Sequence, residues 1–143
     1  MSAPAEPYGQ LLGALRRLRT AIAVRDRAVA GALHLRESDL SVLELLHREG
    51  QQSPTVLAAR TRTHAATMTG ILARLERGGW IVRVPTEGDR RSVRIIGTSV
   101  ERFMMLYAAD TERLERVFRG WAPNHAEAFL RSVEEIAEAL ETA

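Results

Sequence analysis

The hydrophobic pattern of this chain leaves the helical period at one point, and this change limits the possible folds more than any other feature. Before Gly78-Gly79, apolar residues recur every three or four positions, which is the spacing of amphipathic helices. After the two glycines, residues 80–84 and 92–96 are short β-prone runs on either side of a polar, turn-rich segment. Two such runs predict a β-hairpin that directly follows a helix.

Four helices are predicted before the hairpin, and cap or breaker residues mark most of their ends. Ser53 and Thr63 are the expected N-caps of the third and fourth helices, and Pro54 fits the first helical position of the third. Gly31 and Gly50 are expected just after the first and second helices. The four helices run from Tyr8 to about Ala30, from near Ser38 to Arg48, from Pro54 to about Arg60 and from His64 to Arg77.

Two helices joined by a tight turn and followed at once by a hairpin form a winged helix-turn-helix. The expected fold class is therefore mainly α: a winged helix-turn-helix with a two-stranded wing, flanked by N- and C-terminal helices. Behind the hairpin, the pattern predicts one helix over residues 99–119, a break at 120–124 and a last helix over 125–141.

The terminal helices carry more apolar surface than a small core can cover. The last helix has an apolar seam, and most of its acidic residues lie away from that seam. We interpret these helices as a dimer interface, with an intramolecular helical cap as the alternative. The expected parts are an N-terminal dimerisation helix at 1–36, the winged helix-turn-helix domain at 37–98 and C-terminal dimerisation helices at 99–143.

The charge of the chain is concentrated in one segment. All 20 basic residues are Arg, and with 18 acidic residues the formal net charge is +2. Residues 60–94 alone carry a net charge of +5, whereas residues 95–143 carry −4. A basic block between neutral and acidic flanks is typical of a surface that meets a polyanion. A solvated, arginine-rich surface is the alternative interpretation.

Several classes of protein are disfavoured by what the sequence lacks. There is no cysteine, so disulfides, thiol nucleophiles and thiol-based sensing are excluded. No apolar run is long enough for a membrane span, and residues 1–7 lack the features of a signal peptide, so a cytoplasmic protein without membrane contact is expected. No hydrolase, metalloprotease or phosphate-loop motif occurs. Glu44-x-x-His47 has the spacing of two metal ligands on a helix, but a di-iron site of that kind needs two such motifs and the sequence has one. We therefore expect no enzyme activity, no metal and no cofactor.

Residues 57–98 resemble a known family. They contain Leu75-Glu76-x-x-Gly at the end of the fourth helix and Asp89-Arg90-Arg91 in the hairpin. These motifs, with the order of the helices and the chain length, resemble the MarR-type (multiple-antibiotic-resistance regulator) winged-helix transcription regulators. Gly70 departs from the family pattern, because many members carry Arg or another polar residue at this position of the recognition helix.

The resemblance implies a homodimeric, ligand-responsive regulator of transcription. Such a protein binds double-stranded DNA at an inverted repeat, one recognition helix per half-site, and acts as a repressor. It also implies a small aromatic or anionic effector, whose pocket residues stay unassigned. The alternative is a helical dimerisation or scaffold module whose degenerate winged helix no longer binds specific sequences.

The expected DNA-binding residues lie on the two helices of the motif and on the wing. The fourth helix presents its N-terminal side chains to base edges, and arginines late on it are expected to contact phosphate. A helix N-terminus adds phosphate contacts at Ser53 and Thr55. On the wing, an arginine suits a narrow minor groove, and the resemblance assigns this role to Arg91, with Asp89 ordering the loop by pairing with an Arg. The full set is Ser53, Thr55, Arg62, Thr63, His64, Thr67, Thr69, Arg74, Arg77, Asp89, Arg90, Arg91 and Arg94.

Overall fold

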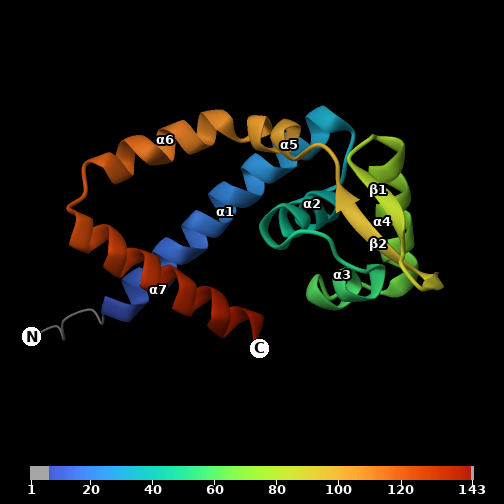
Figure 1. Cartoon of the computed structure of the whole chain (residues 1–143). Coiled ribbons are helices and arrows are strands. Elements are labelled where there is room, and N and C mark those ends of the chain that lie inside the picture. The colour runs from blue at the N-terminus through green and yellow to red at the C-terminus, as the bar shows by residue number, and fades with distance from the viewer. Residues whose placement is uncertain (1–6, 143) are drawn as a thin grey trace, which may run out of the picture. The chain divides into compact units, whose positions relative to one another are not determined.

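The structure is a computed structural model that describes residues 7–142, except for the side chains of Arg90 and Val100. It is mainly helical with one two-stranded antiparallel sheet, as the sequence predicted (Figure 1). The described chain divides into two compact units between Phe103 and Met104. The elements are α1 (Pro7–Leu33), α2 (Glu37–Glu49), α3 (Pro54–Arg60), α4 (Ala65–Arg77), β1 (Ile81–Thr86), β2 (Asp89–Gly97), α5 (Val100–Leu106), α6 (Ala108–Arg119) and α7 (Pro123–Glu141).

Helix α1 was expected to end before Gly31. In the structure it continues to Leu33. Its end is closed by His34, whose φ of 56° lies in the left-handed region. The N–H groups of His34 and Leu35 donate to the carbonyls of Gly31 and Ala30, at 3.3 and 2.9 Å. This is a Schellman motif, in which the left-handed position is usually glycine. Ala30 is buried where α1 packs against α2, so tertiary packing holds the helix together past the glycine.

The core of the first unit is formed by the buried faces of α2, α3 and α4. Ser53 caps α3 as expected: its Oγ accepts a hydrogen bond from the Val56 N–H at 3.2 Å. Thr63 does not cap α4, because the helix begins at Ala65 with His64 at the N-cap position. The fully buried side chains of this core include Val42, Leu57, Met68, Ile71, Leu72, Leu75, Ile81 and Ile95.

The β-hairpin joins this core through its base. Ile81 pairs with Gly97 at the base, and a single bridge between Gln52 and Ile95 ties the hairpin to the loop before α3. The turn from α4 into the hairpin depends on glycine twice. A Cβ on Gly78 would lie 2.7 Å from the indole of Trp80, and Gly79 has a φ of 75°.

The second unit is a helical segment without a buried core of its own. Residues 99–119 were expected to form one helix, but they form α5 and α6, separated at Tyr107. The segment has neither proline nor glycine, so helix propensity alone could not predict the break. Trp121 fills the α6–α7 corner, with ring centroids 4.6 Å from His125, 5.1 Å from Phe118 and 5.0 Å from Phe129. No helix within residues 7–142 is long and apolar enough to cross a membrane.

Candidate nucleic-acid interface

Helix α4 exposes the face that was expected to read DNA. Its buried stripe is Met68, Ile71, Leu72 and Leu75. On the other side, His64, Ala65, Ala66, Thr67 and Thr69 are exposed in the first two turns. Small and hydroxyl-bearing side chains at a helix start allow close approach of the backbone to base edges in a major groove. Thr69 also donates to the carbonyl of Ala65 at 3.0 Å, which leaves its methyl group and an oxygen lone pair for a ligand.

The turn before α4 is fixed by its own side chains. Thr61 Oγ1 donates to the Leu57 carbonyl at 2.7 Å, and the hydroxyls of Thr61 and Thr63 lie 2.9 Å apart. Thr63 is thus used within the turn, which is why it does not cap α4. Arg62 between them is exposed and has a φ of 51°, in a second Schellman motif closed by the Thr63 N–H and the Ala58 carbonyl at 2.8 Å. The turn therefore holds an arginine outward at the entry to the recognition helix.

Arg74 makes a contact that the sequence pattern does not predict. Its Nε and Nη2 donate to Asp39 Oδ2 and Oδ1 at 3.1 and 2.9 Å. Asp39 is fully buried, and its Oδ2 also accepts the Arg36 N–H at 2.9 Å, where α2 begins. The hydrogen bond from Arg74 to Asp39 raises the pKa of the guanidinium above its ordinary value. The expected phosphate-binding arginine is thus also a structural link between α2 and α4.

A signal for Asp39 was present in the sequence. Positions 39, 42, 43 and 46 recur at helical spacing, and three of them are apolar. An acidic residue in such a stripe is buried with it and needs a partner, because an unpaired buried carboxylate is strongly unfavourable. The pattern does not identify the partner, which lies 35 residues further along the chain.

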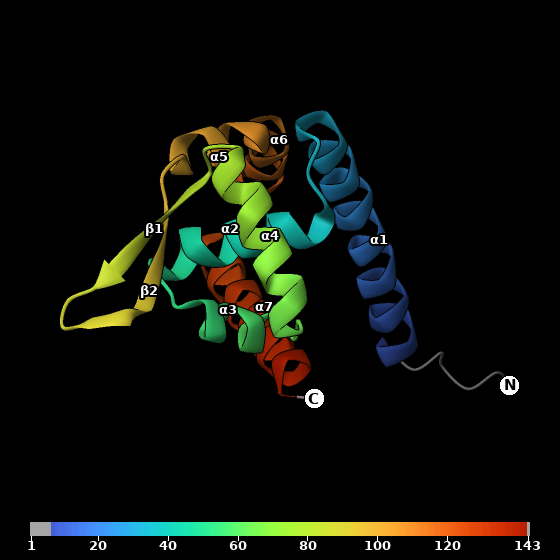
Figure 2. The ribbon, with the colours of Figure 1, turned by 90° about the vertical axis from the view of Figure 1, so that its right-hand side faces the viewer.

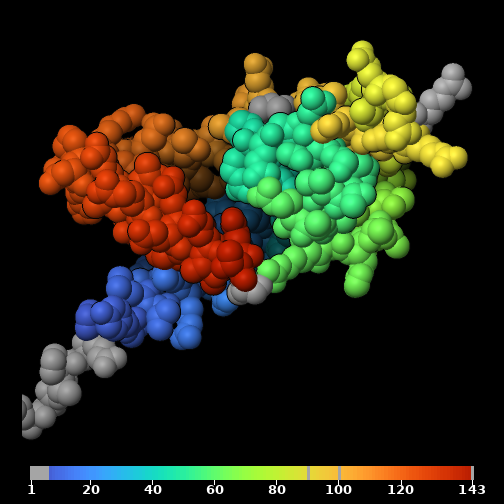
Figure 3. Space-filling view, turned by 60° about the horizontal axis from the view of Figure 1, so that its bottom comes forward, coloured from blue at the N-terminus to red at the C-terminus, as the bar shows by residue number. Residues whose placement is uncertain are grey.

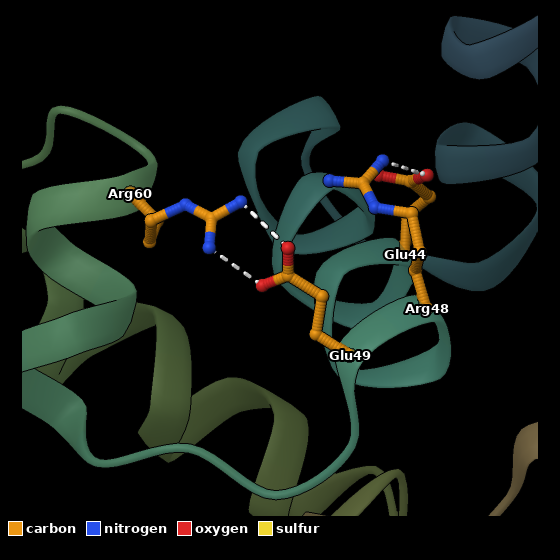
Figure 4. Close-up of polar contacts among 4 residues, drawn as sticks. All are labelled: Glu44, Arg48, Glu49 and Arg60. Carbon is orange, nitrogen blue, oxygen red and sulfur yellow. Dashed lines mark hydrogen bonds and ion pairs between the residues drawn. The ribbon is translucent and has the colours of Figure 1, made fainter.

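Two further arginines of the basic block form ion pairs within the chain. Arg60 forms a bidentate pair with Glu49, with both N–O distances 2.7 Å, which joins the ends of α3 and α2 (Figure 4). Arg83 on β1 lies 3.5 Å from Glu76 on α4. Pairing neutralises part of the +5 charge of residues 60–94. Among the described side chains, Arg77, Arg91 and Arg94 are exposed and make no ion pair with a described residue.

The wing carries Arg91 on an irregular part of β2, whereas Arg94 is paired with Val84 in the regular register. The pairing with β1 passes from Pro85–Val93 directly to Thr86–Asp89, so residues 90–92 have no partner in the regular register. Such a bulge re-aims side chains away from the sheet. Asp89 was expected to pair with an Arg side chain; the contact that the structure describes is from the Arg91 N–H to Asp89 Oδ1 at 2.9 Å. The side chain of Arg90 lies outside the described residues.

The wing extends away from the helices of its unit. Figure 2 shows β1 and β2 reaching beyond α2, α3 and α4, and in the space-filling view the yellow hairpin protrudes next to the green surface of the helix-turn-helix (Figure 3). A narrow projection of this kind can enter a groove beside the one that a recognition helix occupies. The unit thus has two separate exposed surfaces, the polar face of α4 and the arginine-bearing wing. A DNA duplex can contact both surfaces at the same time.

The other expected positions agree with a surface role. Thr55 is exposed on the first turn of α3, and Ser53 beside it uses its hydroxyl as the cap. Glu44, from the Glu44-x-x-His47 motif, forms an ion pair with Arg48 at 2.8 Å (Figure 4). Within residues 7–142, no three His, Cys, Asp or Glu side chains are grouped so as to hold a metal ion.

Comparison with known proteins identifies the domain. A sequence model of the MarR family matches residues 35–93, which contain α2, α3, α4, β1 and the first part of β2 with Arg90 and Arg91. The HTH-type transcriptional regulator PecS of Dickeya dadantii is 34% identical over 111 residues, which are 73% of this chain and 64% of that protein. This chain thus spans just under two thirds of that relative's length.

Solved structures have the same fold over nearly the whole chain. FabT of Streptococcus pneumoniae, solved in complex with DNA, has a TM-score of 0.70 at 18% identity, and the match covers 94% of this chain and 98% of FabT. NadR, solved in complex with 4-hydroxyphenylacetate, has a TM-score of 0.64 at 21% identity, and the match covers 99% and 96% of the two chains. Residues 35–93 thus match the MarR family model, and these solved structures share the fold over nearly the whole chain.

Proposed function

We propose that this protein is a sequence-specific DNA-binding regulator of transcription. The observation that supports this most is the combination, on one unit, of an exposed polar face of α4 with a protruding arginine-bearing wing. In this proposal Thr67, Thr69 and His64 face base edges, and Arg91 enters the minor groove. The proposed backbone contacts are Ser53, Thr55, Arg62, Thr63, Arg74, Arg77, Arg90 and Arg94, with Asp89 ordering the wing. FabT, which is similar in fold, was solved bound to DNA.

The proposed assembly is a homodimer. Helix α1 exposes Leu11, Leu12 and Leu18 at 51–58%, and α7 has no buried residue although it carries five large apolar side chains. We propose that residues 1–36 and 99–143 form the dimer interface and that residues 37–98 bind DNA. Two recognition helices related by a two-fold axis fit an inverted repeat with half-sites about one helical turn apart.

We further propose that the regulator is a cytoplasmic repressor released by a small aromatic or anionic effector. NadR, with a similar fold, was solved with the aromatic acid 4-hydroxyphenylacetate. The described cavity beside His47 and Phe103 measures only about 10 Å³, about the space of one water. An aromatic effector is too large for this cavity and needs another site, whose residues we leave unassigned.

A selection experiment tests the proposed function. The protein is used to select duplexes from a random-sequence pool, and the selected sequence is then footprinted. We expect a selected inverted repeat, protected symmetrically over two half-sites whose centres lie about 10 base pairs apart. Failure to enrich any sequence would support the alternative, a dimerisation module with a degenerate winged helix. No observation on the described residues favours an enzyme.

A further inference from the structure

Arg74 lies at the edge of the face that α4 presents to DNA. Thr67, Gly70, Arg74 and Arg77 are spaced by three, four and three residues, so they lie along one side of the helix. Thr67 and Arg77 are exposed, whereas the Arg74 side chain is 23% exposed. Its guanidinium group therefore lies between the buried core and the exposed face.

The ion pair with Asp39 uses one edge of that guanidinium group. Nε and Nη2 both donate to the carboxylate, which is the bidentate geometry that fixes the plane of an arginine. Asp39 itself is held by the Arg36 N–H and is fully buried. A carboxylate that cannot move holds the arginine in one orientation, so little side-chain entropy remains to be lost on binding.

The opposite edge of the guanidinium group is turned toward Gly70. A guanidinium has five N–H donors, and Nη1 donates to no described residue. Among the described side chains, the one within 4 Å of a Cβ placed on Gly70 is Arg74, whose Nη1 would lie 3.7 Å away. Because Gly70 has no side chain, nothing at this position covers Nη1. Gly70 thus leaves open an edge of the arginine that lies one turn further along the helix.

We propose that Asp39 is a positioning residue, which holds Arg74 so that its Nη1 edge binds a DNA phosphate beside Gly70. This inference rests on the proposed function and names a contact within that interface. The competing explanation is that the pair only joins α2 to α4 and that DNA does not contact Arg74. The two explanations differ in the salt dependence of DNA binding, because only a phosphate contact releases counterions.

The test compares wild type with the double variant Asp39→Asn/Arg74→Gln. Both charges are removed together, so no unpaired charge stays buried and the fold is retained. Retention of the fold is checked by circular dichroism and urea unfolding. Affinity is then measured over a salt series for two duplexes: one selected by the wild type from a random pool, and one of mixed sequence.

We expect the double variant to bind both duplexes about tenfold more weakly, by the same factor, because a phosphate contact carries no sequence information. The slope of log K against log salt should be shallower by about one. The control is Glu44→Gln/Arg48→Gln, which removes an exposed pair of the same charges from α2 and should leave both slopes unchanged. If the amide pair does not fold, Asp39→Leu/Arg74→Met replaces the pair with apolar groups for the same measurement.

Two results would overturn the inference. A folded double variant with the wild-type slope on both duplexes would show that the pair is only structural. A loss confined to the selected duplex would show that Arg74 reads a base. If the wild type selects no sequence, the proposed function fails, yet the slope on the mixed duplex still decides whether Arg74 contacts phosphate.

Discussion

At the scale of single residues, some arginines of the basic block at 60–94 are paired within the chain and others are exposed. Arg60, Arg74 and Arg83 form ion pairs with acids of the same unit, and two of these acids lie outside the basic block. Arg91 and Arg94 are exposed on the wing. Charge counted along the sequence therefore overestimated how many arginines are available to a polyanion.

Arg91→Ala tests the role of the wing. Arg91 is exposed, so its loss should leave the free energy of unfolding within about 0.5 kcal/mol of wild type. If its side chain lies in a groove, the affinity for the selected duplex should fall by about 1–3 kcal/mol. Fluorescence anisotropy measures the affinity, and Arg113→Ala on α6 is the control, an exposed arginine outside the proposed interface. An Arg91→Ala variant as tight as the control would contradict the wing contact.

His34→Gly tests the end of α1. His34 is a non-glycine residue with a φ of 56°, a conformation that costs an L-residue about 1–2 kcal/mol and glycine almost nothing. Glycine also makes the unfolded chain more flexible, so we expect a net stabilisation of roughly 0.5–1 kcal/mol. Ala32→Gly, two residues earlier and helical, should destabilise by about 1 kcal/mol. Urea unfolding measures both, and equal losses in the two variants would contradict this account of the helix end.

At the scale of elements, the sequence predicted the type and order of the structure better than its boundaries. The helix-turn-helix and hairpin were predicted because amphipathic periodicity changes visibly at Gly78-Gly79. Three helices end in the same Schellman geometry, but only α4 does so with glycine; α1 uses His34 and α3 uses Arg62. A helix end at a residue other than glycine depends on tertiary packing that overrides local preference. The prediction that placed the end of α1 before Gly31 was therefore wrong.

The exposed positions of the candidate interface were predictable from the sequence, whereas the contacts within it were not. The exposed face of α4 follows from its apolar stripe, and the wing arginines follow from the hairpin. The bidentate Asp39–Arg74 pair joins residues 35 positions apart, and periodicity carries no information on such distances. The unpaired segment 90–92 depends on a register shift that turn residues alone do not specify.

Asp39→Ala tests the link between α2 and α4. It removes a fully buried carboxylate, leaving Arg74 without its partner and the Arg36 N–H without its acceptor. We expect a loss of about 3 kcal/mol in the free energy of unfolding, since breaking a buried pair leaves an uncompensated charge. Glu44→Ala breaks an exposed pair on the same helix and should cost less than about 1 kcal/mol. Similar small losses for both, measured by urea unfolding, would contradict the structural role of Asp39.

At the scale of the whole molecule, the proposed homodimer rests on the apolar side chains that the terminal helices expose. Val133 and Ile136 on α7 are 44% and 38% exposed and lie in a stripe with Phe129, Leu130 and Leu140. Apolar stripes of this length on a single chain mark an interaction surface. The acidic charge of residues 95–143 also keeps this surface electrostatically distinct from the basic winged helix.

Val133→Glu/Ile136→Glu tests that interface. Charges within an apolar interface are strongly unfavourable, so the variant should be a monomer of about half the wild-type mass by size exclusion with light scattering. Its affinity for a single half-site should stay close to wild type, whereas its affinity for the full repeat should fall. Glu134→Gln, between the two positions, is the control and should remain a dimer. A wild type that is itself a monomer of 15.9 kDa would contradict the assembly.

The most direct test of the account is the ratio of two affinities. The dissociation constant is measured for the selected duplex and for a scrambled duplex of the same composition, in one buffer near 150 mM salt. A sequence-specific dimer is expected to bind the selected duplex at least about 10³-fold more tightly. Equal and weak binding to both duplexes would contradict it, because the polar face of α4 and the wing would then attract DNA by charge alone.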